Sequence, residues 1–409
     1  MTAIKTYDEF LICEHCLAEN ELQNEIRKRG TPIEECLICP AEGGRALPAR
    51  DPLVTRIFRA LIRLNYSEWH YNTHVGGDGL EDLIFRDKKI FNLPEGASQL
   101  DFEDAFLVME EIGWYPKNEE DISLGGSYSE GWVLDGLRDV MDSCIDGIVS
   151  RAFKENFHHL LLDVRKIIDG IRLDIEREVE SGRAYFRARV GVKERLRKKR
   201  GGGEIPTKPQ YGYLPFTAKD IDRPPIKVAT EGRLNRVRVS VLYMATDVET
   251  AVAELRPHPG HLVSTAKFVS LRPIKIADFA AHDIRDYLSD SRLEDLRAAL
   301  SISSILDLPI QPEQRHLYLL TQLFSDCLRE AGFEGVAFRS SVGPGVNVVC
   351  FAEDAFQEEP GSGSVMEVRS LQYELVGRES LPQDFDRTGY QSDSDDPLSS
   401  LADGLARRA

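Results

Sequence analysis

Four cysteines near the start of the chain have the residue type and spacing to bind a metal. Cys13 and Cys16 form one C-x-x-C pair, Cys36 and Cys39 form a second, and 19 residues separate the two pairs. This spacing is typical of a four-cysteine zinc site, in which each pair presents two thiolates to one tetrahedral ion. A bound metal can organise a segment too short to build its own core, so we predict a structural Zn²⁺ knuckle over residues 1–48.

A second set of residues lies in the C-terminal half, where polar side chains occur at positions that a purely structural interpretation does not require. These side chains are Arg187, Arg189, Arg233, Asn235, Tyr243, Glu254, Ser340, Ser341 and Asn347. They come from segments far apart in the chain. We interpret them as parts of one site that folding assembles.

Hydrophobic patterns predict the elements that must position these residues. Segments rich in Val, Ile, Phe and Tyr predict strands at 237–244, 261–270, 274–278, 335–338 and 346–351. Helical periodicity predicts helices at 248–255, 292–300 and 317–331, the last followed by Gly332 as a natural C-cap. The second half of the chain is therefore predicted to be a mixed α/β domain.

The segment between the cysteines and this domain is predicted to be mostly helical, as a bundle over 49–180. Apolar residues recur at steps of three or four from Leu53 to Ile62 and from Phe153 to Ile175, the second run typical of one long amphipathic helix. The basic run Lys193–Arg200 is interpreted as a solvated loop, with a nucleic-acid patch as the alternative. Residues 386–409 are Ser/Asp-rich and predict a disordered acidic tail.

The ordered polar motifs of residues 181–385 resemble the RES domain family. A Y-x-R-x-R opening, a G-R-x-N segment, Tyr243 and Glu254 eleven positions apart, and an aromatic-x-S-S motif with a later Asn occur here in family order. Leu234 stands where the family usually has Trp. Arg339 stands where many members have Pro, and we match Ser340 rather than its neighbour to the family serine. The preceding helical region resembles, more loosely, the HEPN-type domain found before some RES domains.

This resemblance implies a cytoplasmic bacterial enzyme that consumes NAD⁺, often as the toxin of a toxin–antitoxin pair, with a fold similar to ADP-ribosyltransferases. The expected fold class is α+β, in which a zinc knuckle and a helical bundle precede a mixed α/β RES domain. Leading activities are NAD⁺ breakdown by water or by phosphate. Transfer of ADP-ribose to a protein is the alternative that uses the same pocket.

The chemistry of NAD⁺ cleavage fits the residues that carry the resemblance. Guanidiniums offer paired donors to pyrophosphate oxygens, a role suited to Arg187 and Arg233. Nicotinamide is a flat cationic ring, which the aromatic face of Tyr243 can attract. Both contacts would orient the dinucleotide.

A carboxylate is the remaining requirement. Cleavage of the N-glycosidic bond develops positive charge on the ribose, so a nearby carboxylate stabilises the transition state more than the ground state. Glu254 is the candidate, and Ser340 is expected to fix the ribose or a phosphate, since no G-x-S-x-G motif surrounds it. Asn235 and Asn347 complete the expected NAD⁺-binding set.

A different activity is conceivable in the N-terminal half. Arg151 and His158 have six residues between them, which matches the R-x4-6-H spacing by which HEPN domains cut RNA. Seven positions are close to two helical turns, so both side chains would lie on one helix face, where His could transfer protons and Arg could hold phosphate. Sensing or partner binding without catalysis is the alternative for this half.

Composition limits the classes of partner. The 409 residues carry 51 basic and 68 acidic side chains, a net charge of −17, which opposes loading onto nucleic acid or an anionic membrane. We find no apolar run long enough for a membrane span and no signal peptide, and we expect a cytoplasmic protein.

A cytoplasmic NAD⁺-degrading enzyme would harm its own cell, so we expect an inhibitory antitoxin partner or restraint by the N-terminal half. A homodimer is the commonest expectation for oligomeric state.

Overall fold

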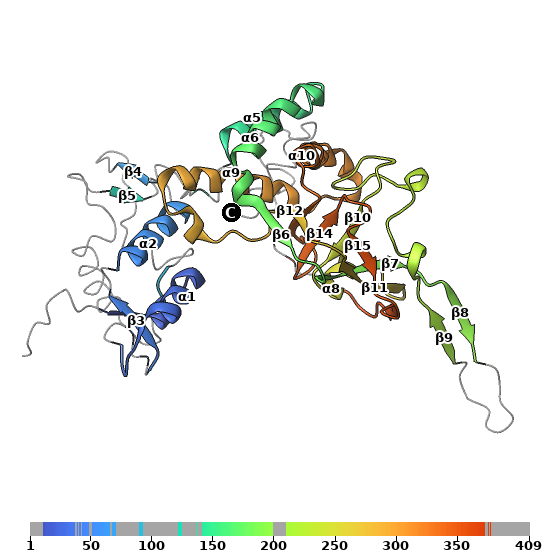
Figure 1. Cartoon of the computed structure of the whole chain (residues 1–409), viewed down its shortest axis with the longest axis horizontal. Helices are drawn as coiled ribbons and strands as arrows, with labels where there is room; N and C mark the ends of the chain where they lie inside the picture. The colour runs from blue at the N-terminus through green and yellow to red at the C-terminus, as the bar shows by residue number, and fades with distance from the viewer. Residues whose placement is uncertain are drawn as a thin grey trace, which may run out of the picture. The chain divides into compact units, whose positions relative to one another are not determined.

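The structure is a computed structural model that describes two compact units. The described residues are 11–36, 39, 41, 43–48, 51–65, 68–70, 90–92, 122–124, 137, 141–198, 210–372, 375 and 377. The first unit comprises residues 1–142 and 282–301, and the second comprises residues 143–281 and 302–409. Figure 1 labels many of the helices and strands of both units. The predicted tail at 386–409 lies outside the described residues, and the predicted domain bounds at 48, 180 and 385 stay predictions.

The first unit contains a small antiparallel sheet with strand order β1-β3-β2 beside two helices. Its elements are β1 (Leu11–Cys13), the 3-10 turn η2 (Glu14–Cys16), α1 (Asn20–Arg29), β2 (Thr31–Pro32), β3 (Arg45–Pro48), α2 (Pro52–Asn65), β4 (Glu68–His70), β5 (Ile122–Leu124) and the 3-10 turn η6 (Ile284–Tyr287). Asp51 caps α2, since its Oδ1 accepts hydrogen bonds from the amides of Leu53 and Val54 at 3.0 and 3.2 Å. The predicted helix over Leu53–Ile62 is confirmed.

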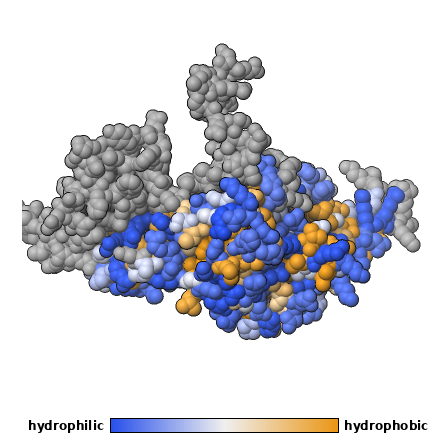
Figure 2. Space-filling view, turned by 90° about the horizontal axis from the view of Figure 1, so that it is seen from above, coloured by the Kyte–Doolittle hydropathy of each residue, from blue (hydrophilic) through white to orange (hydrophobic). Residues whose placement is uncertain are grey.

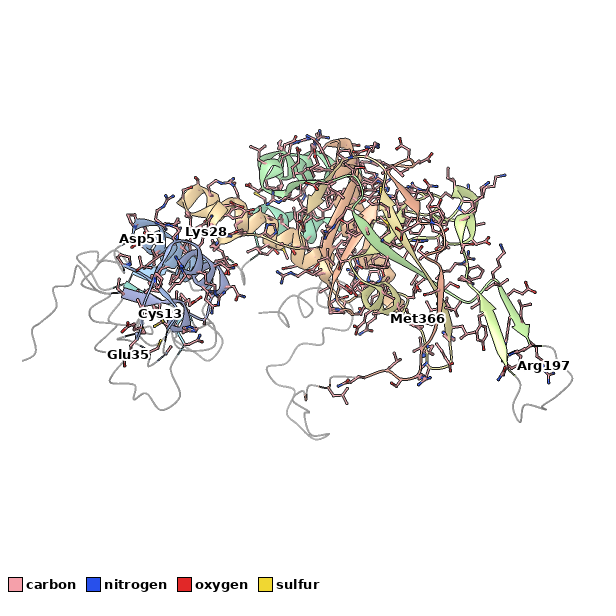
Figure 3. The ribbon with its side chains drawn as sticks, turned by 60° about the horizontal axis from the view of Figure 1, so that its bottom comes forward. Cys13, Lys28, Glu35, Asp51, Arg197 and Met366 are labelled. Carbon is pink, nitrogen blue, oxygen red and sulfur yellow. The ribbon has the colours of Figure 1, made fainter. Side chains whose placement is uncertain are left out.

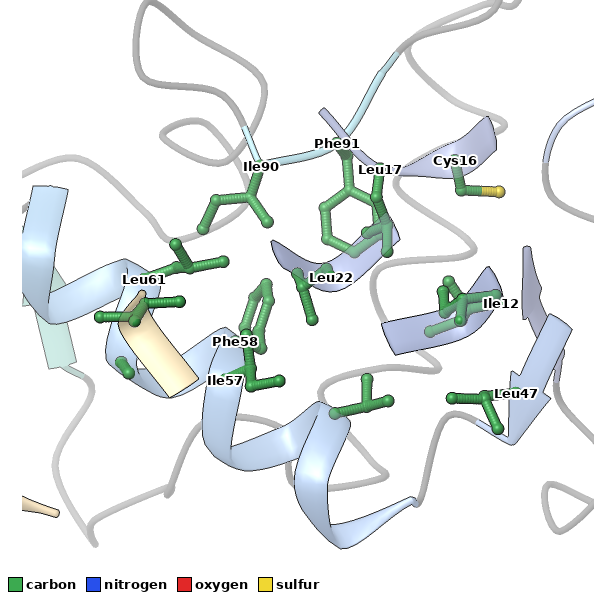
Figure 4. Close-up of a cluster of buried hydrophobic side chains, with 14 of the residues drawn as sticks. Ile12, Cys16, Leu17, Leu22, Leu47, Ile57, Phe58, Leu61, Ile90 and Phe91 are labelled. Atoms are coloured by element: carbon green, nitrogen blue, oxygen red, sulfur yellow. The ribbon is translucent and has the colours of Figure 1, made fainter. Parts of the chain in front are cut away.

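The core of the first unit joins distant segments. Figure 4 shows Phe58 of α2 close to Phe91, with their ring centres 6.0 Å apart. Residues of 282–301 also enter this core, among them Ile284, Tyr287 and Leu293. The helix predicted at 292–300 is the middle of α9 (Asp290–Asp307), which begins in the first unit and ends in the second.

The second unit is built on a nine-stranded sheet. Its strand order is β15-β11-β7-β10-β14-β13-β12-β6, with β16 also paired to β11, and every pairing is antiparallel except β12 with β13. The strands are β6 (Glu176–Val179), β7 (Ala184–Val190), β10 (Leu242–Ala245), β11 (Leu262–Ser270), β12 (Ile274–Asp278), β13 (Gly335–Arg339), β14 (Val346–Cys350), β15 (Phe356–Glu358) and β16 (Ser364–Glu367).

Helices and 3-10 turns complete the second unit. They are α5 (Ser143–Ala152), η3 (Phe157–His159), α6 (Leu161–Gly170), α7 (Arg172–Ile175), η4 (Ala218–Asp220), η5 (Ile226–Val228), α8 (Val248–Ala253), η7 (Pro312–Leu317) and α10 (Tyr318–Glu330). Gly332 follows α10 with φ at 88°, as its predicted role as a C-cap requires. The α+β class predicted from the sequence is confirmed.

Two of the predicted elements differ in length or continuity. The strand predicted from residue 237 begins only at Leu242, because Arg238 adopts a left-handed backbone (φ 66°) that a strand cannot include. The long helix predicted over Phe153–Ile175 is wrong. The chain instead forms η3, α6 and α7, and the side chain of Asn156 caps η3 by accepting a hydrogen bond from the amide of His158 at 3.1 Å.

This break separates the two residues of the predicted RNA-cutting pair. Arg151 lies at the end of α5, where its guanidinium donates to Glu155 and Asp163, and His158 lies in η3. The prediction that both lie on one helix face is therefore wrong.

The basic run after β7 is also more regular than predicted. Residues of Lys193–Arg200 form β8 (Glu194–Arg197), which pairs with β9 (Tyr211–Leu214) as a two-stranded ribbon rather than a loop. Figure 2 shows hydrophilic residues over most of the described surface on one face, with hydrophobic residues in smaller patches. None of the described helices is long and apolar enough to cross a membrane.

Candidate functional site

The four predicted metal ligands lie together in the first unit. All four cysteines are buried, and their sulfur atoms lie within 4.8 Å of one another. Three sulfur pairs are closer still: Cys13 with Cys39 at 3.3 Å, Cys13 with Cys16 at 3.6 Å and Cys16 with Cys36 at 3.6 Å. Four thiolates about 2.3 Å from one zinc ion would lie about 3.8 Å apart, so these sulfurs need only small shifts to bind Zn²⁺.

A cavity of about 490 Å³ lies in the second unit. Its walls combine aromatic rings, three guanidiniums and one carboxylate. The lining residues are Phe186, Arg187, Ala188, Gly232, Arg233, Tyr243, Met244, Ala245, Ala251, Glu254, Leu255, Arg256, Ile310, Tyr318, Phe338 and Asn347. Of the residues predicted for an NAD⁺ site, the structure brings Arg187, Arg233, Tyr243, Glu254 and Asn347 to this cavity.

Glu254 is the only acidic residue among the described residues that line the cavity. It directly follows α8, whose N-cap residue Asp247 accepts a hydrogen bond from the amide of Thr250 at 2.7 Å. One carboxylate oxygen, Oε1, accepts a hydrogen bond from Ser340 Oγ at 2.6 Å and another from Asn347 Nδ2 at 2.6 Å. Both contacts hold Oε1 and leave Oε2 available to a ligand.

The loop after β13 fixes the orientation of Ser340. Its Oγ accepts hydrogen bonds from the amides of Val342 and Gly343, at 3.2 and 2.9 Å, and donates to Glu254. A Cβ on Gly343 would lie 2.8 Å from the Cα of Thr250, so this loop packs directly against α8. The structure thus places Ser340, rather than Ser341, beside the carboxylate.

Arg187 extends from β7 and is held by backbone carbonyls. Its guanidinium donates to Ile221 O at 2.5 Å, to Tyr243 O at 2.7 Å and to Asp222 O at 3.4 Å. Burial lowers the pKa of Arg187 to about 10. The side chain therefore remains a cation at neutral pH. Three of its five N–H groups donate to these carbonyls, and the other two can donate to an anionic ligand.

Arg233 is held in a similar way at another wall of the cavity. It is 9% exposed, and its Nη1 donates to the carbonyls of Leu306 and Leu308 at 2.5 and 2.8 Å. The guanidinium lies near two rings, 5.8 Å from the centre of Tyr318 and 5.9 Å from that of Phe338. Burial lowers its pKa from the ordinary value.

Tyr243 lines the cavity, and its hydroxyl is held by neighbouring protein groups. The hydroxyl donates to Asn235 Oδ1 at 2.9 Å and accepts from the amide of Leu234 at 3.0 Å. Burial raises the pKa of Tyr243 to about 12, so the phenol stays neutral.

Asn235 does not line the cavity, because its amide group donates to the carbonyls of Thr230, Arg236 and Val239. Leu234, where the family has Trp, is buried and does not form a cavity wall.

Sequence reasoning missed several residues that build the site. Phe186, Tyr318 and Phe338 supply aromatic walls, and Arg256 supplies a third guanidinium, whose Nη2 donates to Ile310 O at 3.1 Å.

The sequence patterns also did not reveal the polar side of α10. Its residues Thr321, Gln322 and Ser325 are buried and donate to the carbonyls of Arg233, Gly232, Asn235 and Leu234. Polar residues at three-to-four-residue spacing inside an apolar helix are the signal that could have identified them.

Comparisons with known proteins agree with part of the sequence prediction. The RES domain family matches residues 204–373, which contain every cavity-lining residue named above except Phe186, Arg187 and Ala188. Among solved structures, a chain of the crystal structure of the M. tuberculosis MbcT–MbcA toxin–antitoxin complex is similar at 9% identity and a TM-score of 0.26. That match covers 50% of this chain and 92% of that chain. No curated protein matches the sequence. The predicted RES domain is confirmed over residues 204–373, and the HEPN-like character of 49–180 stays a prediction.

Proposed function

We propose that the second unit cleaves the bond between nicotinamide and ribose in NAD⁺. The observation that carries this proposal is the geometry of Glu254, a single carboxylate held by Ser340 and Asn347 in a cavity with three guanidiniums. This combination of charges suits a substrate with an anionic diphosphate and a reacting centre that becomes cationic. The RES domain match supports the same chemistry.

In the proposed reaction the C1′–N bond breaks and its electron pair leaves with the nicotinamide nitrogen, which becomes neutral. Positive charge develops on the ribose, and the carboxylate of Glu254 stabilises it. A water molecule or a phosphate then attacks C1′, and with water a proton is released to solvent. Ser340 and Asn347 act as positioning residues, because they contact Glu254 and fix the direction of its free oxygen.

The guanidiniums and rings bind the rest of the dinucleotide. The guanidiniums that can pair with pyrophosphate oxygens are those of Arg187, Arg233 and Arg256. Each of them already donates some of its N–H groups to backbone carbonyls, which fixes the orientation of the guanidinium plane before substrate binds. The ring of Tyr243 is suited to contact nicotinamide, whose positive charge it attracts.

In the first unit, Cys13, Cys16, Cys36 and Cys39 would bind Zn²⁺. Four thiolates fill all four positions of a tetrahedral site, so the metal's role there is to stabilise the fold. The four cysteines belong to the hydrophobic core of this unit, so metal binding and folding of this unit would be coupled.

The biological role that fits this activity is that of a toxin in a toxin–antitoxin or defence system of a bacterial cytoplasm. Loss of NAD⁺ halts growth, so an inhibitory partner protein is expected to restrain the enzyme. ADP-ribosyl transfer to a protein target is the alternative, because the same cation on C1′ can be attacked by a protein side chain.

NAD⁺ labelled in its adenine ring, incubated with the purified chain and a bacterial extract, tests both forms of the proposal. Free nicotinamide with all label in small molecules supports breakdown by water or phosphate. Free nicotinamide with label on a protein band supports the transferase. Absence of nicotinamide release by the purified chain and by the chain in extract would contradict both.

A further inference from the structure

The β8–β9 ribbon extends from the sheet of the second unit and has a fixed base (Figure 1). The amide of Lys193 donates to Leu214 O at 2.9 Å, which closes the ribbon at this end. Ser264 Oγ donates to Gly191 O at 2.8 Å and accepts from the amide of Phe216 at 3.0 Å. The ribbon is therefore held at its base by β11. Figure 3 shows Arg197 at the end away from the sheet.

One face of the ribbon is open and carries two exposed leucines beside Glu194. Cross-strand partners lie on the same face, and the register pairs Glu194 with Leu214 and Leu196 with Gly212. Leu196 and Leu214 are 46% and 44% exposed. A Cβ on Gly212 would meet nothing within 4 Å, so the position opposite Leu196 leaves space for another side chain.

The other face is cationic and aromatic. The register pairs Arg195 with Tyr213 and Arg197 with Tyr211 on this face. The guanidinium of Arg195 lies 3.9 Å from the ring centre of Tyr211 and 5.9 Å from that of Tyr213. This positive face contrasts with the net charge of −17 on the whole chain.

An isolated two-stranded ribbon is marginally stable, because neither face is covered and both edges carry unpaired backbone groups. Within the described part of the chain, β8 pairs with β9 alone. A strand added beside β8 would continue both faces, since side chains alternate between them. Aliphatic residues would then lie beside Leu196, and acidic residues would lie beside Arg195 and Arg197.

We propose that the β8–β9 ribbon docks a protein partner through a segment of alternating aliphatic and acidic residues, which adds to β8 as a strand. Nucleic acid fits this surface less well. Arg195 already covers one ring face of Tyr211, which a base would need for stacking, and the leucine face offers nothing to a phosphate backbone. The proposal does not depend on the reaction in the cavity.

Fluorescence anisotropy with the full chain tests the proposal. The probes are a fluorescein-labelled nine-residue peptide that alternates Val and Glu, a peptide of the same composition with its Glu residues grouped at one end, and a single-stranded oligonucleotide of equal charge. We expect the alternating peptide to bind at least tenfold more tightly than either of the others. Leu196→Ser and Arg195→Ser should each weaken its binding at least tenfold.

Leu173→Ser is the matched control, because Leu173 is an exposed leucine in α7 of the same unit, and it should leave binding unchanged. Circular dichroism and thermal unfolding check that each variant is folded. Undetectable binding of the alternating peptide, equal binding of the grouped peptide, tighter binding of the oligonucleotide, or wild-type binding by Leu196→Ser would each overturn the proposal.

Discussion

At the scale of a single residue, Tyr243 lines the cavity while its hydroxyl joins Asn235 to the amide of Leu234. Tyr243→Phe removes both hydrogen bonds and leaves two buried polar groups without this partner. We expect the free energy of unfolding at pH 7 to fall by about 1–3 kcal/mol. Tyr213→Phe in the ribbon should change it little.

The same substitution has a pH signature. The folded pKa of Tyr243 is raised to about 12 from an ordinary value of 10, so the folded protein keeps this proton longer than the unfolded chain. The stability that Tyr243 contributes is present below pH 10 and is lost as the pH rises through 12. Denaturant unfolding at pH 7, 10 and 11 should therefore show the difference between wild type and Tyr243→Phe shrinking. A difference that stays constant or grows would contradict this assignment.

The sequence predicted which residues lie at the cavity better than it predicted what each of them does there. Arg187, Tyr243, Glu254 and Asn347 reach the cavity as the sequence suggested, because each lies in or directly after a strand or helix with a readable pattern. Asn235 was predicted to bind NAD⁺ but holds its own loop, because an amide in a loop bonds whichever backbone groups the loop brings near. The spacing of residues in the sequence does not specify which hydrogen-bond partners such an amide takes.

At the scale of elements, the contact between α8 and the loop before β14 sets the position of Ser340. A Cβ on Gly345 would overlap Asp247 Oδ2, the cap of α8, and would lie 2.8 Å from Thr250 Oγ1. Gly345→Ala should therefore displace this loop and lower kcat/KM for NAD⁺ at least tenfold, about 1.4 kcal/mol of barrier. Gly170→Ala at the end of α6, where a Cβ meets nothing within 4 Å, should leave kcat/KM unchanged.

Helix α10 positions Arg233 from behind. The amide of Gln322 donates to the carbonyls of Gly232 and Asn235, on either side of Arg233 in the loop. Gln322→Met should raise KM for NAD⁺ several-fold with a smaller change in kcat, since the proposed role of Arg233 in this loop is to bind the pyrophosphate and not to act on the reacting bond. Steady-state kinetics beside Glu330→Gln, an exposed position on the same helix, would separate the two effects. A loss confined to kcat would refute this role.

Element positions were predictable where burial imposes a pattern. The strands β11, β12, β13 and β14 and the helix α10 lie within one residue of their predicted starts, because each is apolar over its whole length or on one side. The sequence did not predict the breaks in the helix over 153–175, because its apolar spacing is also compatible with short segments, of which α6 and α7 bury apolar residues and η3 buries none. The packing of 282–301 into the first unit was also unpredictable, since tertiary contacts rather than local pattern place Tyr287 in that core.

At the scale of the whole molecule, we expect the fold of the first unit to depend on a metal bound by its four clustered cysteines. Elemental analysis should find about one zinc per chain, and the Cys13→Ser, Cys16→Ser double variant should lose it. Because these cysteines lie in the hydrophobic core, the variant should also be cut by protease within residues 11–65. Cys144→Ser, at an exposed cysteine in α5, should keep both zinc and protease resistance. Full zinc occupancy in the double variant would refute the site.

The central claim is that the negative charge of Glu254 stabilises the ribose cation as nicotinamide leaves. Nicotinamide release from NAD⁺ by Glu254→Gln tests it most directly, because glutamine keeps the shape and can still accept from Ser340 and Asn347 but carries no charge. Glu249→Gln, at an exposed carboxylate in α8, the helix that Glu254 directly follows, is the matched control. We predict that Glu254→Gln is folded and at least about 100-fold slower than wild type, roughly 2.7 kcal/mol of barrier, while Glu249→Gln equals wild type. A folded Glu254→Gln variant that releases nicotinamide at the wild-type rate would contradict the mechanism.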